Sequence, residues 1–150
     1  MDFEVVSRRE IESNLHYDKI VNNRSHIVIS INEDSNYACI SSNKCCCDIL
    51  RLIFDDIDEH FEEEYNLFSI NQAQQILEFI FKYLNEIDLI IIHCHAGISR
   101  SAGVGCALSY IINQNDDDLV KKKPCFNRFV YRTILNEYFD NVNKYPKIGV

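Results

Sequence analysis

Cys94 and Arg100, with five residues between them, lie between two segments of contrasting pattern, and this arrangement constrains the fold more than any other feature of the sequence. The preceding run, Leu89 to Ile92, is aliphatic and lacks polar alternation, which is typical of a strand buried on both faces of a mainly parallel sheet. From Ser101 to Ile112 the chain is proline-free and mostly apolar, which predicts a helix packed deep against that sheet. The sequence therefore predicts a central strand, a tight loop and a buried helix.

The loop at residues 94–100 has the composition of an anion site. A short loop entering a helix turns backbone N–H groups inward, and together with the helix N-terminus they form a concave site for anions. Arg100 adds a planar fork that can hold two oxygens of a phosphate. The same positive field favours the thiolate of Cys94, because such surroundings lower a cysteine pKa from about 8.5 to roughly 3.5–7.5. A sulfur nucleophile in a phosphate cradle indicates phosphoryl transfer.

The segment His93-Cys94-x5-Arg100-Ser101 resembles the signature of the cysteine-based protein tyrosine phosphatases. Its inner residues, Ala96-Gly97-Ile98-Ser99, are similar to those of the small dual-specificity-like members. The resemblance covers residues 49–112 most clearly and the C-terminal segment more weakly. We therefore expect one α/β domain over residues 1–150, with a central, mainly parallel sheet flanked by helices. The phosphate-binding loop would connect a central strand to a buried helix.

The resemblance also implies roles for the residues of this segment. Cys94 would attack phosphorus in line, while Arg100 holds the equatorial oxygens. Ser101 would hydrogen-bond the sulfur and make it a better leaving group, and His93 would brace the loop from behind. The remaining contacts to the phosphate would come from the backbone N–H groups of His95, Ala96, Gly97, Ile98, Ser99 and Arg100.

In the family, an aspartic acid on a loop after the corresponding strand protonates the leaving group, and Phe54-Asp55-Asp56-Ile57 resembles that element. We expect Asp56 to be this acid and then, as a carboxylate, to activate the water that hydrolyses the phosphocysteine. Asp55 and Asp58 are the alternatives.

No metal or other cofactor is expected. His93-Cys94-His95 offers three zinc ligands in a row, but adjacent residues rarely converge on one tetrahedral ion, and no second pair of ligands has the required spacing.

The formal net charge of −8 disfavours nucleic acids and anionic membranes as partners, because both require a dense positive surface. We expect a phosphorylated protein as the substrate; the sequence specifies neither its identity nor the oligomeric state.

Seven cysteines without the spacing of a disulfide framework imply a reducing compartment. The N-terminus lacks the apolar stretch of a signal peptide, and no run is long enough to cross a bilayer, so a cytoplasmic location is expected.

Three alternative functions remain open at this point. A phosphopeptide-binding module without turnover would need Arg100 but neither the thiolate nor the acid. A phosphoinositide phosphatase typically carries lysines inside the loop, where this chain has His95 and Ile98. An RNA 5′-phosphatase of the same superfamily would need a basic approach surface. Among protein substrates we expect phosphotyrosine to be preferred to phosphoserine and phosphothreonine, because a phenolate is expelled more easily than an alkoxide.

The rest of the chain supplies the expected framework. Two capping boxes, Ser7-x-x-Glu10 and Ser69-x-x-Gln72, predict helix starts, the first helix running towards Leu15. Gly103 and Gly105 are expected to permit close helix-to-strand packing. The Lys121–Lys123 cluster is interpreted as solubilising, and Cys45–Cys47, to which we assign no function, as small buried hydrophobes. Asn127 gains a supporting role, since Pro124–Arg128 resembles the family's Pro-Asn-Arg entry to the last helix, interrupted by Cys125 and Phe126. Further strands are expected at 3–6, 26–31 and 48–54, a strand or edge at 37–40, and a helix at 126–145.

Overall fold

The computed structural model of the chain describes residues 1–57 and 65–146, and its sheet has four parallel strands in the order β1-β4-β2-β3. The strand that precedes the Cys94 loop, β4, is central, as predicted: it pairs with β1 on one side and with β2 on the other. The strands are β1 (Asp2–Ser7), β2 (His26–Asn32), β3 (Cys46–Ile53) and β4 (Leu89–Cys94).

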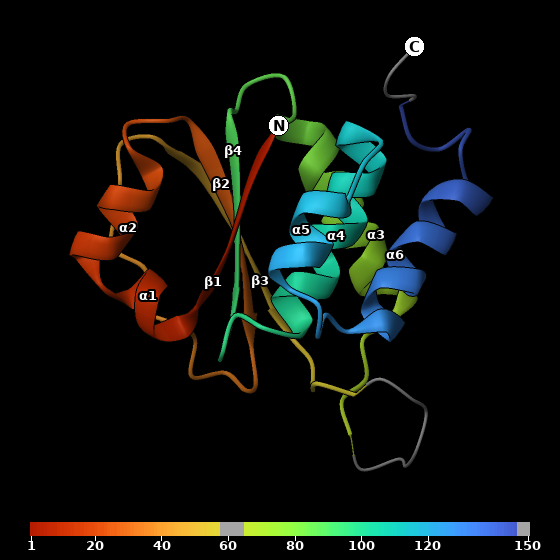
Figure 1. Cartoon of the computed structure of the whole chain (residues 1–150), viewed down its shortest axis with the longest axis horizontal. Coiled ribbons are helices and arrows are strands. Elements are labelled where there is room, and N and C mark those ends of the chain that lie inside the picture. The colour runs from red at the N-terminus through yellow and green to blue at the C-terminus, as the bar shows by residue number, and fades with distance from the viewer. Residues whose placement is uncertain (58–64, 147–150) are drawn as a thin grey trace.

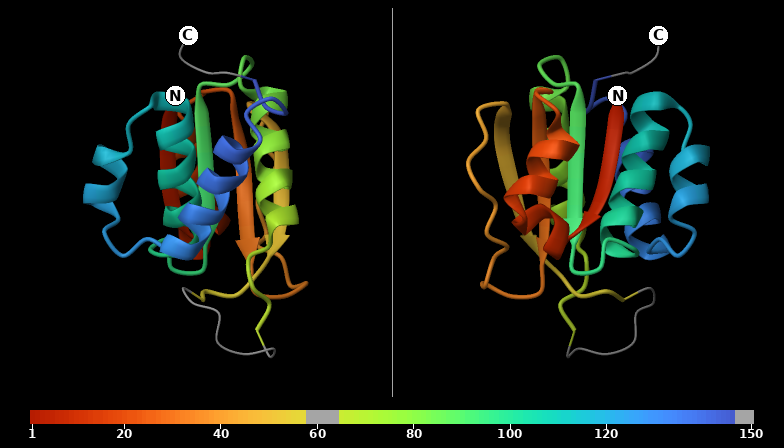
Figure 2. Two further views of the ribbon diagram at one scale, coloured as in Figure 1. Left: turned by 90° about the vertical axis from the view of Figure 1, so that its right-hand side faces the viewer. Right: turned by 60° about the vertical axis from the view of Figure 1, so that its left-hand side comes forward.

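Helices cover both faces of this sheet, as Figures 1 and 2 show. One face carries α1 (Arg8–Glu12) and α2 (Asn14–Val21). On the other side lie α3 (Ile70–Tyr83), α4 (Arg100–Asn113), α5 (Asp117–Lys122) and α6 (Arg128–Asp140). The chain is thus a three-layered α/β structure, in agreement with the expected fold class.

The double covering explains why β4 shows no polar alternation. Ile90 and Ile92 belong to the larger apolar core, on the side of α3 to α6. Leu89 and Ile91 belong to the smaller core, on the side of α1 and α2. Every residue of β4 is buried, as a strand covered on both faces requires.

Both capping boxes are present. The Ser7 hydroxyl accepts from the backbone N–H of Glu10, and the Glu10 carboxylate accepts from that of Ser7, each at 3.1 Å. Ser69 and Gln72 exchange the same pair of bonds, also at 3.1 Å. These bonds satisfy N–H groups that have no partner inside the helix, and so begin α1 and α3 where the sequence predicted.

Several predicted boundaries were wrong. Residues 37–40 form no strand, because Ala38 N–H donates to the Asn32 side chain (3.0 Å) instead of to a strand. The first helix stops at Glu12, and Ser13 caps a separate helix, α2. The last helix covers Arg128–Asp140 only, and a short helix that the sequence did not predict, α5, precedes it. The cysteine triplet is not a buried run, since Cys47 is exposed.

The two glycines of α4 both allow close packing, against different partners. A Cβ at Gly105 would lie 2.9 Å from Val5 Cγ2 in β1 and 3.0 Å from Leu119 Cδ2, so helix-to-strand packing is confirmed there. A Cβ at Gly103 would lie 2.6 Å from the backbone oxygen of Asn127, so this glycine brings α4 against the entry to α6.

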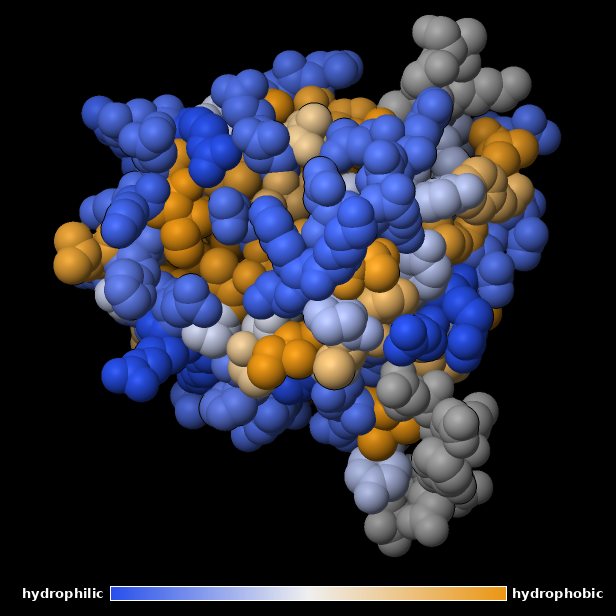
Figure 3. Space-filling model, in the orientation of Figure 1, coloured by the Kyte–Doolittle hydropathy of each residue, from blue (hydrophilic) through white to orange (hydrophobic). Residues whose placement is uncertain are grey.

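The surface seen in Figure 3 is largely hydrophilic, with apolar residues showing between the polar ones. Within the described part of the chain, no helix has the length and apolar character needed to span a bilayer.

Candidate active site

Cys94 is the last residue of β4, and its side chain lies under the loop that leads into α4. Its Sγ lies 3.0 Å from the Ser101 hydroxyl oxygen and accepts the backbone N–H of Gly97 at 3.3 Å. The residue is only 2% exposed. The contact expected between Ser101 and the sulfur is therefore present, and the thiol is held at the floor of the loop.

The surroundings of Cys94 favour its thiolate. Burial raises the pKa of the thiol. Hydrogen bonds from the side chain and backbone of Ser101 and from the backbone of Gly97, together with the positive charge of Arg100, lower the pKa by more than burial raises it. The net effect is a pKa below the ordinary value for cysteine. A thiolate is the nucleophilic form of cysteine, so this shift favours the reactive form.

The carbonyl groups of the loop are fixed from outside. In a trans peptide the C=O of one residue and the N–H of the next point in opposite directions. Each anchored carbonyl therefore turns the following N–H away from its anchor, and N–H groups so oriented can receive an anion. The anchors are His93 Nδ1 on Cys94 O (3.3 Å), Arg8 N on His95 O (3.1 Å), Lys123 Nζ on Gly97 O (2.9 Å), and the backbone N of Gly103 (2.8 Å) and Asn127 (2.9 Å) on Ser99 O.

Gly97 is the residue that lets the loop rest on the end of β1. Its φ is +72°, in the left-handed region. A Cβ there would lie 2.5 Å from the carbonyl carbon of Val6 and 2.6 Å from the nitrogen of Ser7. Backbone atoms cannot yield as a flexible side chain can, so position 97 requires glycine.

The side chain of Arg100 is held at the edge where β2, β3 and β4 end. It is 5% exposed, donates to the Phe54 carbonyl at 2.9 Å, and pairs with Glu33 at 3.3 Å. A guanidinium has five N–H donors, so these two bonds position the fork and leave donors for a ligand. Because the carboxyl ends of parallel strands share one edge, this is also where ligands bind in open α/β sheets.

Asp56 lies against the loop, whereas Asp55 does not. One carboxylate oxygen of Asp56, Oδ1, accepts from the Ser99 hydroxyl at 2.7 Å and from the Asn127 amide at 2.9 Å. Asp55 instead binds Asn66, through its backbone N–H (2.7 Å) and its carboxylate (2.8 Å). Asp58, the third candidate acid, lies outside the described residues.

Asn127 joins three parts of the site. Its amide N–H group also donates to Ile57 O (3.2 Å), and its amide oxygen caps α6 by accepting from Val130 N–H (2.9 Å). With its backbone N–H on the Ser99 carbonyl, this buried side chain connects the Asp56 segment, the loop and α6.

His93 is buried behind the loop and is neutral. Its Nδ1 donates to the Cys94 carbonyl, since a carbonyl can only accept, and its Nε2 accepts from the Ser30 hydroxyl at 2.6 Å. Ser30 in turn accepts from the Asn32 amide at 3.1 Å. Burial lowers the pKa of His93 to about 4, so the ring keeps this tautomer at neutral pH.

Two residues at the site were missed by sequence reasoning. Lys123, interpreted as solubilising, binds the loop carbonyl of Gly97, and Glu33 pairs with Arg100. Glu33 could have been found from the sequence, because it directly follows the strand β2 and therefore lies at the same edge of the sheet as the end of β4. Lys123 had none, since a run of lysines usually marks a solvated face.

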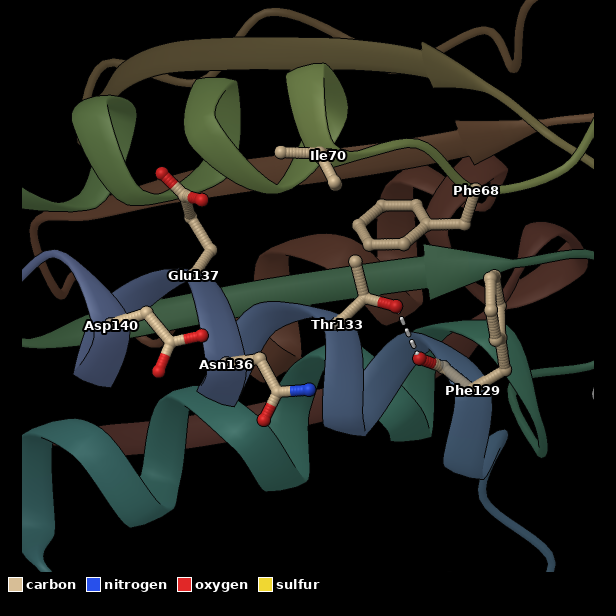
Figure 4. A pocket seen from close by; sticks show the side chains of 7 residues that line it. All are labelled: Phe68, Ile70, Phe129, Thr133, Asn136, Glu137 and Asp140. Atoms are coloured by element: carbon tan, nitrogen blue, oxygen red, sulfur yellow. Dashed lines mark hydrogen bonds between the residues drawn. The ribbon is translucent and has the colours of Figure 1, made fainter.

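A separate hollow of about 290 Å³ lies between α3 and α6, as Figure 4 shows. It is apolar at Phe68 and Phe129 and acidic at Glu137 and Asp140, and neither Cys94 nor Arg100 lines it. Within residues 1–57 and 65–146, no group of three or more His, Cys, Asp or Glu side chains is arranged to hold a metal ion.

No family model and no curated protein matches this chain, but solved structures do. Human tyrosine phosphatase-like serine/threonine/tyrosine-interacting protein has a TM-score of 0.60 and 19% identity, over 88% of this chain and 87% of that one. For human DUSP28 the TM-score is 0.60 and the identity 11%, over 95% and 94%. For PTPMT1, solved in complex with PI(5)P, they are 0.59 and 16%, over 87% and 88%. The chain thus has the fold of the small, dual-specificity-type cysteine phosphatases.

Proposed function

We propose that the chain is a phosphoprotein phosphatase, which hydrolyses phosphotyrosine in preference to phosphoserine and phosphothreonine through a phosphocysteine intermediate. The observation that carries the proposal is the Cys94 sulfur at the floor of the loop, where it lies 3.0 Å from the Ser101 hydroxyl oxygen and accepts the Gly97 N–H at 3.3 Å. The loop carbonyls around it are anchored outward, and the Arg100 fork lies beside it.

In the first step the Cys94 thiolate attacks phosphorus in line. The bond from phosphorus to the leaving oxygen breaks, and its electron pair goes to that oxygen. Asp56, as the carboxylic acid, gives the leaving oxygen its proton. The Arg100 guanidinium and the N–H groups of the loop stabilise the charge on the equatorial oxygens.

In the second step a water oxygen attacks phosphorus while the Asp56 carboxylate takes the proton of that water. The phosphorus–sulfur bond breaks and its electron pair returns to Cys94. The Ser101 hydroxyl, already 3.0 Å from the sulfur, stabilises the departing thiolate by hydrogen bonding. Inorganic phosphate is released, and both catalytic groups return to their starting forms.

Ser99 and Asn127 support the choice of Asp56 as the acid. Both donate to the same carboxylate oxygen, Oδ1, and so hold the side chain toward the loop. An acid must lie within hydrogen-bond reach of the oxygen that it protonates; Asp56 is bonded to Ser99 of the loop, whereas Asp55 is bonded to Asn66.

The test is hydrolysis of p-nitrophenyl phosphate in the presence of EDTA, with wild type compared with Cys94→Ser. The wild type should turn over without added metal, and the variant should lose turnover while still binding vanadate, because the cradle is backbone and Arg100. Cys125→Ser, which changes an exposed cysteine, is the matched control and should remain active.

Activity above a tenth of the wild-type rate in Cys94→Ser would place the nucleophile elsewhere. A wild type that binds a phosphotyrosine peptide but hydrolyses neither this peptide nor p-nitrophenyl phosphate would identify the chain as a binding module.

A further inference from the structure

The phosphate loop begins with the peptide that joins Cys94 to His95, and the orientation of this peptide depends on His93. Its carbonyl oxygen, Cys94 O, accepts from His93 Nδ1 at 3.3 Å, so the N–H of His95 points away from the imidazole. A neutral imidazole carries one proton, and this bond exists only when the proton is on Nδ1. The tautomer of His93 therefore decides whether the first N–H of the loop is held in place.

The other ring nitrogen of His93 is bonded to Ser30. The Ser30 hydroxyl oxygen lies 2.6 Å from Nε2, and both side chains are fully buried. A hydroxyl has one hydrogen to donate, and within residues 1–57 and 65–146 the structure pairs this hydroxyl with no acceptor besides Nε2. While Ser30 donates to Nε2, the proton of the ring is kept on Nδ1.

Asn32 gives the Ser30 hydroxyl its direction. Its amide nitrogen donates to the hydroxyl oxygen and to the carbonyl oxygen of Ser30, both at 3.1 Å, so the hydroxyl receives one hydrogen and directs its own toward His93. The amide orientation is itself fixed, because the amide oxygen accepts the backbone N–H of Ala38 at 3.0 Å and a backbone N–H can only donate. The direction of each bond is therefore set by the bond before it.

These bonds form one hydrogen-bond network, whose members in order are Ala38, Asn32, Ser30, His93 and Cys94 O. Between its first two members lies the exposed segment 33–37, which leaves the sheet at the carboxyl end of β2. Glu33, at the start of this segment, pairs with Arg100 at 3.3 Å. The segment is thus joined to the phosphate loop at both of its ends, through Arg100 at one and through the network at the other.

We propose that Asn32 and Ser30 are positioning residues for the phosphate loop, which keep the N–H of His95 turned toward the phosphate by holding His93 in its Nδ1–H tautomer. The proposal rests on the proposed function and adds two residues that prepare its site. A donor that is oriented before the substrate arrives does not have to be reoriented in the transition state. Loss of this one bond should weaken the binding of a phosphate-like ligand by about 2- to 12-fold, the usual range for a hydrogen bond between neutral groups.

The first measurement reads the tautomer and needs no catalytic activity. Two-bond NMR correlations between the ring hydrogens and ring nitrogens, recorded on nitrogen-15-labelled protein at pH 8, show which nitrogen of His93 carries the proton. The wild type should carry it on Nδ1. A proton on Nε2 instead would overturn the proposal, even if no variant folds.

Asn32→Asp should reverse the network. The new carboxylate still accepts from Ala38 but has no hydrogen for Ser30, so the Ser30 hydroxyl turns toward it and accepts from His93 Nε2 instead. Burial lowers the pKa of His93 to about 4, so the ring stays neutral at pH 8 and its proton leaves Nδ1. We expect the NMR pattern of an Nε2–H ring, and vanadate affinity that is about 2- to 12-fold weaker.

Ser30→Ala supplies the background that separates positioning from a general effect of the new charge. Without the hydroxyl, the change at position 32 cannot reach His93. In that background Asn32→Asp should leave the tautomer unchanged and should lower vanadate affinity much less than it does alone. The matched control is Asn36→Asp, which adds the same charge to the exposed segment 33–37 and should change neither the tautomer nor the affinity.

An Nδ1–H ring that persists in Asn32→Asp would contradict the proposal. So would a loss of vanadate affinity that is as large in the Ser30→Ala background, or that Asn36→Asp reproduces. Failure of the proposed function is seen separately, as a wild type inert toward p-nitrophenyl phosphate, and leaves the tautomer and the vanadate affinities interpretable.

Discussion

Asp55 and Asp56 are neighbours in the sequence but have different partners in the structure. Asp55 ties its own segment to Asn66, while Asp56 receives two hydrogen bonds from Ser99 and Asn127 at the loop. The two carboxylates therefore offer an internal comparison, in which one change removes the expected acid and the other removes a bond that only shapes the segment.

Asp56→Asn should lower the hydrolysis of phosphotyrosine by about 10²- to 10⁴-fold, the usual contribution of a general acid. It should cost far less for p-nitrophenyl phosphate, whose leaving group departs without a proton. The measurement is kcat/KM for both substrates across pH. A leaving-group-dependent loss in Asp55→Asn, with none in Asp56→Asn, would move the role one residue back.

Lys123 gives a second prediction at this scale, as a positioning residue. Its ammonium fixes the Gly97 carbonyl at 2.9 Å and so orients the N–H of Ile98. Lys123→Gln should lower kcat/KM by about 10-fold, since hydrogen bonds to charged groups contribute about 1.5–3 kcal/mol. Vanadate affinity should fall in parallel, because it reports the cradle directly.

The controls for Lys123 are within the same cluster. Lys122→Gln removes the same charge from an exposed neighbour and should have little effect. Lys123→Arg keeps a cationic donor and should recover part of the loss. An unchanged vanadate affinity in Lys123→Gln would show that this lysine does not orient the loop.

The sequence predicted the proximity of those candidate site residues that belong to one short segment. Cys94, Arg100 and Ser101 belong to one short segment, so their proximity follows from covalent distance. The contacts of Lys123 and Glu33 do not follow from covalent distance, because they depend on which distant segments the fold brings to the loop. The choice between Asp55 and Asp56 likewise depends on the turn after β3, which strand alternation does not specify.

At the scale of elements, α4 is placed by its two glycines, and these have different neighbours. Gly105 faces β1 and α5, while Gly103 faces the backbone of Asn127. A larger side chain at position 103 would therefore push against Asn127, the residue that binds Asp56, whereas a larger side chain at position 105 would not.

Gly103→Ala and Gly105→Ala should both destabilise the fold. Helix propensity would gain about 1 kcal/mol from either change, but overpacking costs about 1–3 kcal/mol, and more against rigid backbone. Only Gly103→Ala should also lower phosphotyrosine turnover. Urea unfolding with kcat measured on the same samples tests this, and equal catalytic losses in the two variants would refute the distinction.

The elements themselves were largely predictable, whereas several of their ends were not. Capping boxes identify the starts of α1 and α3, and the unbroken aliphatic run identifies β4, because these signals are local. The break at Ser13 and the end of the last helix at Asp140 were not predicted, although Ser13 itself caps α2 by accepting from the backbone N–H of His16 at 3.4 Å.

At the scale of the whole molecule, buried His93 links stability to pH. Its pKa is about 4 when folded and about 6.5 when unfolded, so the unfolded state binds the proton more readily. The stability associated with the neutral ring is complete above about pH 6.5 and is lost as pH falls toward 4. Linkage gives a loss of roughly 2–3 kcal/mol between pH 7 and 4.5.

The measurement is urea unfolding of wild type and His93→Gln at pH 7 and 4.5. The variant is expected to be less stable at pH 7, and its deficit should shrink by the same 2–3 kcal/mol at the lower pH, since glutamine does not titrate. A deficit that is the same at both pH values would contradict the assignment of a neutral buried ring.

The position of Gly97 on the end of β1 has a consequence for the order of assembly. Synthesis makes Asp2–Ser7 before Leu89–Cys94, so β1 has no partner strand until the later segment has been made. Pairing across such a separation is entropically costly and slow. A folding intermediate with α3 and β4 in place but β1 undocked would lack the surface on which Gly97 rests. Phosphate binding should therefore be regained during refolding only when β1 docks, and the recovery of vanadate binding would measure the rate of that step.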